Sequence, residues 1–342
     1  MELAAVAMVP AREDLMSIHE AQPHALATSE NSRPFYSPRM PILGNDILRS
    51  WMDRIRKLGL RSLWLTSSPR EESVDGSGLD GSAQAEFARQ GVERLLVIQL
   101  KAYAEMDLAD LLLFHCESRN PVTEAEDARG QLGVCLRDHL ALHAKGEQYA
   151  FASAPPDRGQ TPYQFRGYAK RILSARERQE LVGDGLTGAC AMRPLGTEIR
   201  DQVWVGEGAN LADSARVIGP TYIGARTIVH AGATIGPFAS VEHDCVVDCG
   251  TTVERSTILP HTYLAPGLLI RHQLVDGGYL EDLSWGAVAD LRPAGLGRRI
   301  QRRESRRQAF HETDVLSRAG RASTRHFAAS STASQPWLRI EL

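Results

Sequence analysis

The sequence predicts an α/β domain over residues 1–195, a parallel β-helix over residues 196–285 and an arginine-rich, largely disordered tail over residues 286–342. Two patterns lead to this prediction. A branched aliphatic residue recurs at every sixth position in the C-terminal half, and apolar strands alternate with helical segments in the first half. The length of 342 residues, about twice that of a usual domain, agrees with more than one domain.

The composition is that of a soluble globular protein. The chain is 43% hydrophobic and 24% charged, which excludes collagen-like, membrane-embedded and wholly disordered proteins. No apolar run approaches the ~18 residues of a membrane span. The apolar start at Met1–Pro10 contains Glu2 and lacks the basic region of a signal peptide, so we expect a strand there. Five cysteines, an odd number in a long chain, favour a reducing, cytoplasmic location over a disulfide framework.

Charge is distributed unevenly along the chain. The net charge is −3, and residues 292–342 hold 11 Arg against four acidic residues, or +7, which leaves −10 for residues 1–291. An acidic body is not expected to bind nucleic acid. We expect a short basic helix over Arg298–Phe310, whose cluster Arg298–Arg307 either binds an acidic partner or only keeps the tail in solution. From Ser317 onward, Ser, Ala, Thr and Arg dominate, which predicts disorder.

The hexad repeat sets the architecture of the C-terminal half. Ten consecutive positions at a spacing of six hold branched aliphatic residues: Val205, Leu211, Val217, Ile223, Val229, Ile235, Val241, Val247, Val253 and Leu259. The residue four places later is small in nine of the ten hexads, and Tyr263 is the exception. A helix has a period of 3.6 and a strand a period of 2, whereas six residues make one short strand and one corner. Three such units close a triangular coil of about 18 residues with the aliphatic side chains inside.

This pattern resembles the hexapeptide repeat of left-handed parallel β-helices, and the resemblance implies that handedness. The repeat predicts a little over three coils, each packed only against its neighbours. The blurred register beyond Leu264 predicts one irregular closing coil. Exposed coil ends are unpaired strand edges, so we expect a homo-oligomer or a partner chain there.

The first half of the chain alternates strands and helices. We expect strands at Leu3–Val9, Leu60–Thr66 and Arg94–Leu100, helices at Ala83–Gln90 and Asp107–His115, and a further helix from the capping box of Ser174 and Glu177 to about Val182. Another helix follows Asn45 or Asp46, has its apolar residues on one face, and ends at Gly59. Because the strands are apolar throughout, the alternation predicts a parallel sheet covered on both faces.

In its order of segments the chain resembles a known enzyme family. The order is the first strand, PILGNDILRSWMDRIRKLGLRSLWLT (residues 41–66), a strand followed by DLADLLLFH (107–115), FRGYAKRIL (165–173) and the β-helix. It is similar to sugar-1-phosphate nucleotidylyltransferases, in particular those of the mannose-1-phosphate guanylyltransferase kind. The resemblance implies a Rossmann-like N-terminal domain that makes a nucleotide-sugar from a nucleoside triphosphate and a sugar phosphate. It also implies a β-helix that assists assembly or regulation.

The sequence departs from this family where the chemistry takes place. Family members have a glycine-rich GGxGTR loop after the first strand, a lysine in a Lys-Pro-x-x-Pro segment and an aspartate that holds magnesium. Here residues 10–14 read PARED, Ser37 stands at the lysine, and residues 99–103 (QLKAY) stand where the aspartate is expected. Phosphate needs close backbone N–H groups, and magnesium needs carboxylates. We therefore expect a degenerate site, with Mg²⁺ as a cofactor only if nucleotidyl transfer persists.

The predicted function is a nucleotidyltransferase-like protein of nucleotide-sugar or surface-polysaccharide metabolism. It is expected to act as a regulatory or assembly subunit, with itself or with a related nucleotidylyltransferase. An active sugar-1-phosphate nucleotidylyltransferase with a diverged site is the alternative. Arg12, Lys101 and Tyr103 are the candidates for binding an anionic ligand. Asp107 and Asp110 fall on the following helix, where capping and a solvated face explain them.

A hexapeptide-repeat acyltransferase is the second alternative, because such β-helices use a histidine as general base. The candidates are His230, His243 and His261, all of which are expected to point outward. No loop interrupts the repeat between residues 205 and 263, which argues against an acyl-donor site.

The cysteines of the repeat do not predict a metal site. Cys245 takes the small inward position of its hexad, which favours a place in the core. Cys249 meets His243 and Asp244 only across a corner, whose geometry separates such side chains. We therefore expect no bound metal.

Overall fold

A computed structural model describes residues 3–9, 40–60, 62–67, 87–138, 161–300 and 337–341. The chain divides into two compact units. Unit 1 comprises Met1–Pro34, Ser50–Ala169 and Glu304–Leu342, and unit 2 comprises Phe35–Arg49 and Lys170–Arg303. Among the helices of the described ranges, none is long and apolar enough to cross a membrane.

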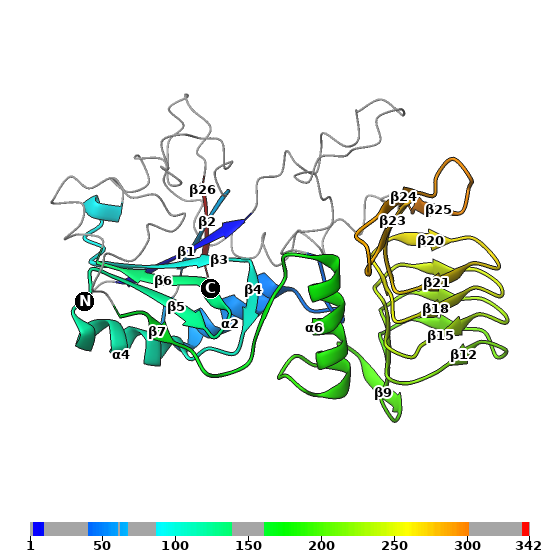
Figure 1. Cartoon of the computed structure of the whole chain (residues 1–342), viewed down its shortest axis with the longest axis horizontal. Helices are drawn as coiled ribbons and strands as arrows, with labels where there is room; N and C mark the ends of the chain where they lie inside the picture. The colour runs from blue at the N-terminus through cyan, green and yellow to red at the C-terminus, as the bar shows by residue number, and fades with distance from the viewer. Residues whose placement is uncertain are drawn as a thin grey trace. The chain divides into compact units, whose positions relative to one another are not determined.

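Unit 1 is built on a seven-stranded mixed sheet in the order β26-β2-β1-β3-β6-β5-β7 (Figure 1). Its strands are β1 (Leu3–Val9), β2 (Ser62–Ser67), β3 (Arg94–Gln99), β5 (Val122–Asp127), β6 (Gly130–Arg137), β7 (Tyr163–Gln164) and β26 (Trp337–Glu341). β1 pairs in parallel with β2 and β3, as expected, but β26 pairs antiparallel with β2 and β6 pairs antiparallel with β3. The expected all-parallel sheet is therefore wrong, because the β5–β6 hairpin folds back onto β3. Three parallel strands alone do not establish a Rossmann-like domain.

Two helices begin where the sequence predicts a cap. α2 (Ile47–Lys57) follows Asp46, whose Oδ1 accepts a hydrogen bond of 2.8 Å from the backbone N–H two residues on. α4 (Leu108–Ser118) follows Asp107, which accepts the equivalent bond at 2.9 Å. Each carboxylate satisfies an N–H group that the first turn leaves without a helical partner. The expected helix at Ala83–Gln90 lies for the most part outside the described residues.

The capping box at the start of α6 (Ala175–Thr187) is confirmed. Ser174 Oγ accepts a hydrogen bond from the N–H of Glu177 at 3.1 Å, and the carboxylate of Glu177 accepts one from the N–H of Leu173 at 2.8 Å. The helix runs beyond its expected end and stops at Gly188, which adopts a left-handed conformation with φ 77°.

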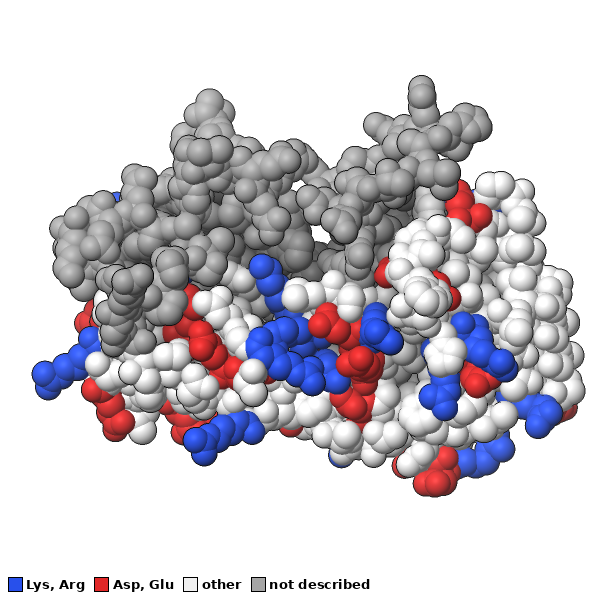
Figure 2. Space-filling model, in the orientation of Figure 1, with Lys and Arg blue, Asp and Glu red and all other residues white. Residues whose placement is uncertain are grey.

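Charged side chains on the described surface form mixed clusters. Figure 2 shows patches of basic side chains bordered by acidic ones on the face in view. In unit 2, Lys170 Nζ lies 3.2 Å from a carboxylate oxygen of Glu180 and 3.2 Å from one of Asp184. Such surface pairs add little to stability but bring the local charge near zero.

Unit 2 contains a parallel β-solenoid of four coils with three faces (Figure 1). Face 1 is a sheet in the order β24-β23-β22-β19-β16-β13-β10-β9, face 2 is β11-β14-β17-β20-β25, and face 3 is β12-β15-β18-β21. The strands are β9 (Thr197–Arg200), β10 (Val203–Val205), β11 (Asn210–Leu211), β12 (Arg216–Val217), β13 (Thr221–Ile223), β14 (Ile228–Val229), β15 (Thr234–Ile235), β16 (Ala239–Val241), β17 (Val246–Val247), β18 (Thr252–Glu254), β19 (Thr257–Ile258), β20 (Thr262–Leu264), β21 (Leu269–Arg271), β22 (Gln273–Asp276), β23 (Tyr279–Asp282), β24 (Val288–Asp290) and β25 (Gly297–Arg299). The aliphatic residues of the repeat, from Ile223 to Val253, are buried inside the coils, as the hexad spacing predicts.

The repeat changes register once within the predicted run. Val241 pairs with Ile258, 17 residues later, whereas β14 and β17 pair at a spacing of 18. Ile258 therefore lies inside the coil, and the expected tenth member, Leu259, packs outside it beside α6. The same shift buries Thr262 completely and leaves Tyr263 partly exposed. This explains why Tyr263 breaks the pattern of small residues.

The expected disordered tail is ordered in its described parts. β24 pairs antiparallel with β23, and β25 pairs antiparallel with β20. Leu291, between these strands, packs against the solenoid core, a contact that the tail's polar composition concealed. The helix expected from Arg298 is wrong for its described start, because Arg298 and Arg299 lie in β25. Residues 301–336 lie outside the described ranges.

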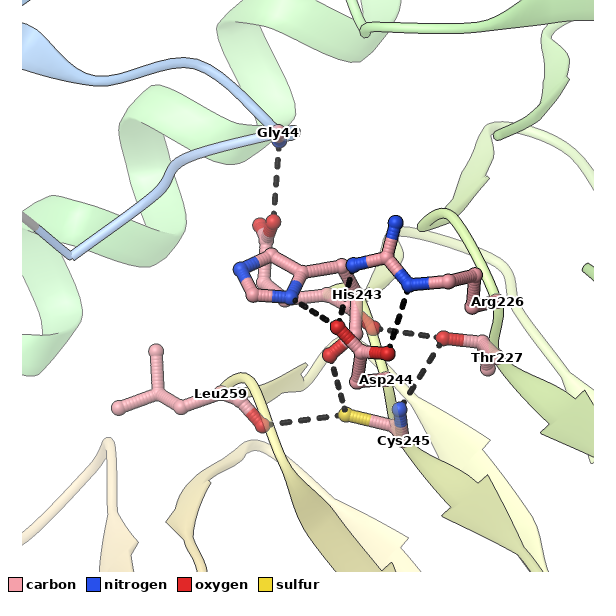
Figure 3. A network of polar contacts seen from close by, with 8 residues as sticks. Gly44, Arg226, Thr227, His243, Asp244, Cys245 and Leu259 are labelled. Carbon is pink, nitrogen blue, oxygen red and sulfur yellow. Dashed lines mark hydrogen bonds and ion pairs between the residues drawn. The ribbon is translucent and has the colours of Figure 1, made fainter. Parts of the chain in front are cut away.

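A buried carboxylate joins the segment 40–46 to the solenoid within unit 2. Oε1 of the fully buried Glu242 accepts hydrogen bonds from the N–H of Leu43 (2.8 Å) and from Ser240 Oγ (3.0 Å), and Oε2 accepts one from the N–H of Gly44 (3.0 Å; Figure 3). Gly44 has φ 77°, and a side chain there would collide with Tyr222. Both the backbone conformation and the close approach therefore require glycine.

Burial raises the pKa of Glu242, and this effect outweighs the charge of Arg178 and the donated hydrogen bonds, which lower it. Arg178, on α6, also donates a hydrogen bond to the carbonyl of Pro41. The ends of the same short segment are thus held by a carboxylate from the solenoid and a guanidinium from α6.

Because the pKa of Glu242 is raised in the folded state, its contribution to stability is complete below its unfolded pKa and is lost as the pH rises through the folded value. We expect the free energy of unfolding of the wild type, measured by urea denaturation from about pH 4 to about pH 8, to fall relative to that of Glu242→Gln. Glu117→Gln, on the exposed side of α4, should follow the wild type. A wild type that gains stability relative to Glu242→Gln over this range would contradict the assignment.

Candidate functional site

One corner of the solenoid carries a network of charged side chains (Figure 3). Arg226, Asp244 and His261 occupy the same position on successive coils, each in a left-handed conformation with φ 57°, 57° and 59°. The guanidinium of Arg226 donates to both carboxylate oxygens of Asp244, from Nε to Oδ1 at 2.8 Å and from Nη2 to Oδ2 at 2.5 Å. The ring of His243 lies against that of His261, with centroids 5.1 Å apart and planes at 86°. These four residues are named the Arg226 corner.

Asp244 is the electrostatic centre of this corner. Its partial burial raises its pKa, but the hydrogen bonds and positive charge of Arg226, together with His243, outweigh burial and lower the pKa to about 2. Asp244 is therefore ionised in neutral solution. A bidentate pair of this kind fixes the direction of the carboxylate as well as its charge.

His243 is oriented by Asp244, as a general base would have to be. Its Nδ1 lies 2.9 Å from Asp244 Oδ2, and because a carboxylate only accepts, Nδ1 carries the proton. The second nitrogen, Nε2, is then the basic one, as in a carboxylate–histidine pair. Of the three predicted histidines, His243 is the one for which the described residues supply this arrangement.

Beneath the corner, Cys245 is fully buried, as its inward hexad position predicts. Its thiol donates to the carbonyl of Leu259 at 3.1 Å, and its N–H donates to Thr227 Oγ1 at 3.3 Å (Figure 3). Burial raises the pKa of the Cys245 thiol, so it stays protonated and unreactive. Cys245 belongs to the core and not to the site.

A second corner brings His230 together with Asp248 and Cys249, and these three residues are named the His230 corner. One donor atom from each residue lies within 4.8 Å of the other two. The Asp248 carboxylate accepts hydrogen bonds from the N–H of Cys249 at 2.7 Å and from the hydroxyl of Tyr263 at 2.8 Å. These bonds lower the pKa of Asp248. Cys249 thus lies in this cluster and not in the group with His243 that was considered from the sequence.

In unit 1, Lys101 and Tyr103 lie at the carboxyl end of β3. Lys101 is exposed, whereas Tyr103 is buried in β4 (Ala102–Ala104) and its hydroxyl donates to Glu105 at 3.2 Å. The guanidinium of Arg54 lies 5.5 Å from the ring centroid of Tyr103. Tyr103 is therefore part of a packed layer beneath Lys101, and Arg12, the third candidate, lies outside the described residues.

Sequence reasoning missed a buried polar cluster in unit 1. His115, on α4, is 1% exposed, and its Nδ1 lies 2.8 Å from Thr123 Oγ1 while its Nε2 lies 3.2 Å from Asp138 Oδ1. Burial lowers the pKa of His115 despite the nearby Asp138. A hydroxyl, an imidazole and a carboxylate are thus in line, but the burial of His115 and Thr123 excludes substrate from them.

Sequence reasoning also missed Arg226 and Asp248. The signal that finds them is the coil length, since each lies 18 residues from its partner: Arg226 from Asp244, and Asp248 from His230. The hexad analysis used this period for the apolar positions alone.

The lowered pKa of Asp244 leads to a prediction in acid. Its stabilising contribution is complete above the unfolded value of 3.8 and is lost as the pH falls towards about 2. Between about pH 4 and about pH 2, the wild type is expected to lose about 1–2 kcal/mol more stability than Asp244→Asn, after allowance for solvent screening of the half-exposed Arg226. Asp213→Asn, at an exposed position of the same solenoid, should keep the wild-type dependence. Equal slopes for wild type and Asp244→Asn would rule out the ion pair.

Comparison with known proteins gives one partial match. No family model matches the chain. Over 104 residues, or 30% of this chain, the sequence is 33% identical to a UTP–glucose-1-phosphate uridylyltransferase of Synechocystis sp.. The match covers 26% of that protein, so the chain aligns with about a quarter of the curated relative's length. The similarity supports a distant relation to the sugar-1-phosphate nucleotidyltransferases.

Proposed function

We propose that the protein is a sugar-1-phosphate nucleotidyltransferase homologue of nucleotide-sugar or surface-polysaccharide metabolism that has lost nucleotidyl transfer. It acts as a regulatory or assembly subunit, with copies of itself or with an active nucleotidylyltransferase. The observation that carries the proposal is the local similarity to a uridylyltransferase, together with the order of segments, which resembles the mannose-1-phosphate guanylyltransferase kind.

The end of β3 supports the loss of catalysis. Ligands of parallel sheets bind at the carboxyl ends of the strands. There, residues 99–104 contain no carboxylate, the next one, Glu105, accepts a hydrogen bond from Tyr103, and Asp107 caps α4. These residues do not fit a magnesium ion, which needs one or two carboxylates directed at it. Exposed Lys101 supplies a positive charge that suits an anionic ligand such as a sugar phosphate.

The strand edges of the solenoid support an assembly role. Its own chain covers part of each end, because β9 pairs with β10 and β25 pairs with β20. On face 3, however, β12 and β21 each have one strand neighbour among the described strands. Leu269, on β21, is 61% exposed at that edge. An apolar edge strand of this kind is suited to pairing with a second chain.

An acyltransferase of the hexapeptide-repeat class is the second candidate. The observation that favours it is the orientation of His243 by Asp244, which prepares Nε2 to accept a proton from a hydroxyl or amine. The sequence shows no loop that interrupts the repeat to hold an acyl donor. The first candidate is therefore preferred.

A turnover assay tests the loss of catalysis. The full chain with Mg²⁺ is expected to release no pyrophosphate above background from UTP with glucose-1-phosphate, or from GTP with mannose-1-phosphate, because the β3 end lacks magnesium carboxylates. Release that Lys101→Ala lowers at least ~10-fold, while Lys57→Ala on exposed α2 does not, would overturn the proposal. In a parallel reaction with acetyl-CoA and an amino sugar, transfer abolished by His243→Ala would establish the second candidate instead.

The assembly role predicts a solution mass above the 37.6 kDa of one chain, measured by size-exclusion chromatography with light scattering. Leu269→Lys, which places a charge at the edge of face 3, is expected to shift the mass to that of a monomer. Leu113→Lys, at a 58% exposed position on α4, serves as the matched control and should leave the assembly intact. A wild-type monomer at micromolar concentration, or an oligomer that Leu269→Lys leaves unchanged, would contradict the role of this edge.

A further inference from the structure

The His230 corner collects three different metal-binding groups at one place on the solenoid. An imidazole, a carboxylate and a thiol come from His230, Asp248 and Cys249, with one donor atom from each within 4.8 Å of the others. His230 and Cys249 are exposed, so an ion can reach them from solvent. Among the described residues, no lysine or arginine forms an ion pair with Asp248.

The backbone holds these groups in place. β14 and β17 pair in register, and the N–H of His230 donates to the carbonyl of Val247 at 2.9 Å, directly before Asp248. The three residues therefore project from adjacent coils of a rigid stack, and their proximity does not depend on a flexible loop. Sites built on regular strands keep their geometry better than sites on loops.

A second set of contacts orients the carboxylate. The Tyr263 hydroxyl and the Cys249 N–H each donate to one oxygen of Asp248, at 2.8 and 2.7 Å. Each oxygen keeps a lone pair for a metal, and outer contacts of this kind commonly support metal ligands. Tyr263 is itself covered by Arg298, whose guanidinium lies 4.9 Å from the ring centroid.

The Arg226 corner supplies the contrast. It also holds three candidate ligands, His243, Asp244 and His261. There, however, Arg226 donates to both oxygens of Asp244 and already neutralises the carboxylate. A cation would have to displace a bidentate guanidinium. The two corners thus offer similar donor counts but opposite electrostatics.

From these contacts we infer that His230, Asp248 and Cys249 form a binding site for a divalent zinc ion. Zinc accepts sulfur, nitrogen and oxygen ligands together, whereas magnesium and calcium prefer oxygen alone. With bonds of about 2.0–2.3 Å, tetrahedral zinc separates its donors by about 3.5 Å, so small side-chain rotations close the site. Three protein ligands leave the fourth position for water or for an external ligand. Binding releases the thiol proton to solvent and leaves two anionic ligands and one neutral imidazole on the metal.

Titration of the full, reduced chain with Co²⁺ tests the site, because cobalt bound to a thiolate gives a charge-transfer band in the near ultraviolet. We expect a saturating band at one cobalt per chain, which added Zn²⁺ abolishes. Cys249→Ser should remove the band, and His230→Ala should weaken binding at least ~10-fold. Both side chains are exposed, so neither substitution removes a core contact.

Two matched controls separate this site from others on the chain. Cys116→Ser changes the other exposed cysteine, in unit 1, and His243→Ala changes the Arg226 corner; both should leave the cobalt band and affinity unchanged. The inference is overturned if no saturable band forms, if the band survives Cys249→Ser, or if binding is lost in either control. The readout is spectroscopic and does not depend on any enzymatic activity of the chain.

Discussion

The pairing of each coil with the next, at a spacing of 17 or 18 residues, is the constraint on which the candidate sites of unit 2 depend. Parallel strands in register place every outward side chain beside the residue one coil away. His230 meets Asp248, and Arg226 meets Asp244, for this reason alone. The solenoid therefore turns a one-dimensional repeat into pairs of side chains, and the chemistry of each corner is decided by which residues occupy equivalent positions on successive coils.

The two corners show how a single cation changes what such a pair can do. At the Arg226 corner the guanidinium satisfies the carboxylate and leaves His243 as the polar group directed by it. At the His230 corner the carboxylate is held by neutral donors, a hydroxyl and a backbone N–H. A carboxylate held in this way keeps its full negative charge for an external cation. The same scaffold thus favours proton chemistry at one corner and metal binding at the other.

Local sequence patterns predicted those parts of the fold that depend on local physics. The hexad spacing located the buried aliphatic residues from Ile223 to Val253, and the caps of α2, α4 and α6 followed from single polar residues. The register shift at Ile258 escaped the prediction, because two adjacent aliphatic residues can both continue a period of six. Tyr263 was the one sign of it in the sequence.

Contacts between distant segments were beyond such patterns. The β5–β6 hairpin joins β3 through backbone pairing that leaves no period across the intervening residues. The bonds from Leu43 and Gly44 to Glu242 span 199 and 198 residues. No spacing rule connects residues so far apart. At the corners, by contrast, the coil length would have been enough, had polar as well as apolar positions been compared at that spacing.

Glu242 also shows that the solenoid is more than a uniform stack. A buried carboxylate is costly, and an apolar residue of similar size often gives equal or greater stability. An apolar residue, however, would pack against the segment 40–46 in many registers, whereas the two oxygens of Glu242 match the N–H groups of Leu43 and Gly44 alone. The requirement for glycine at position 44 makes this fit still more selective. The carboxylate therefore specifies where this segment lies on the coil, and specificity of position, more than stability, accounts for a charge at the centre of unit 2.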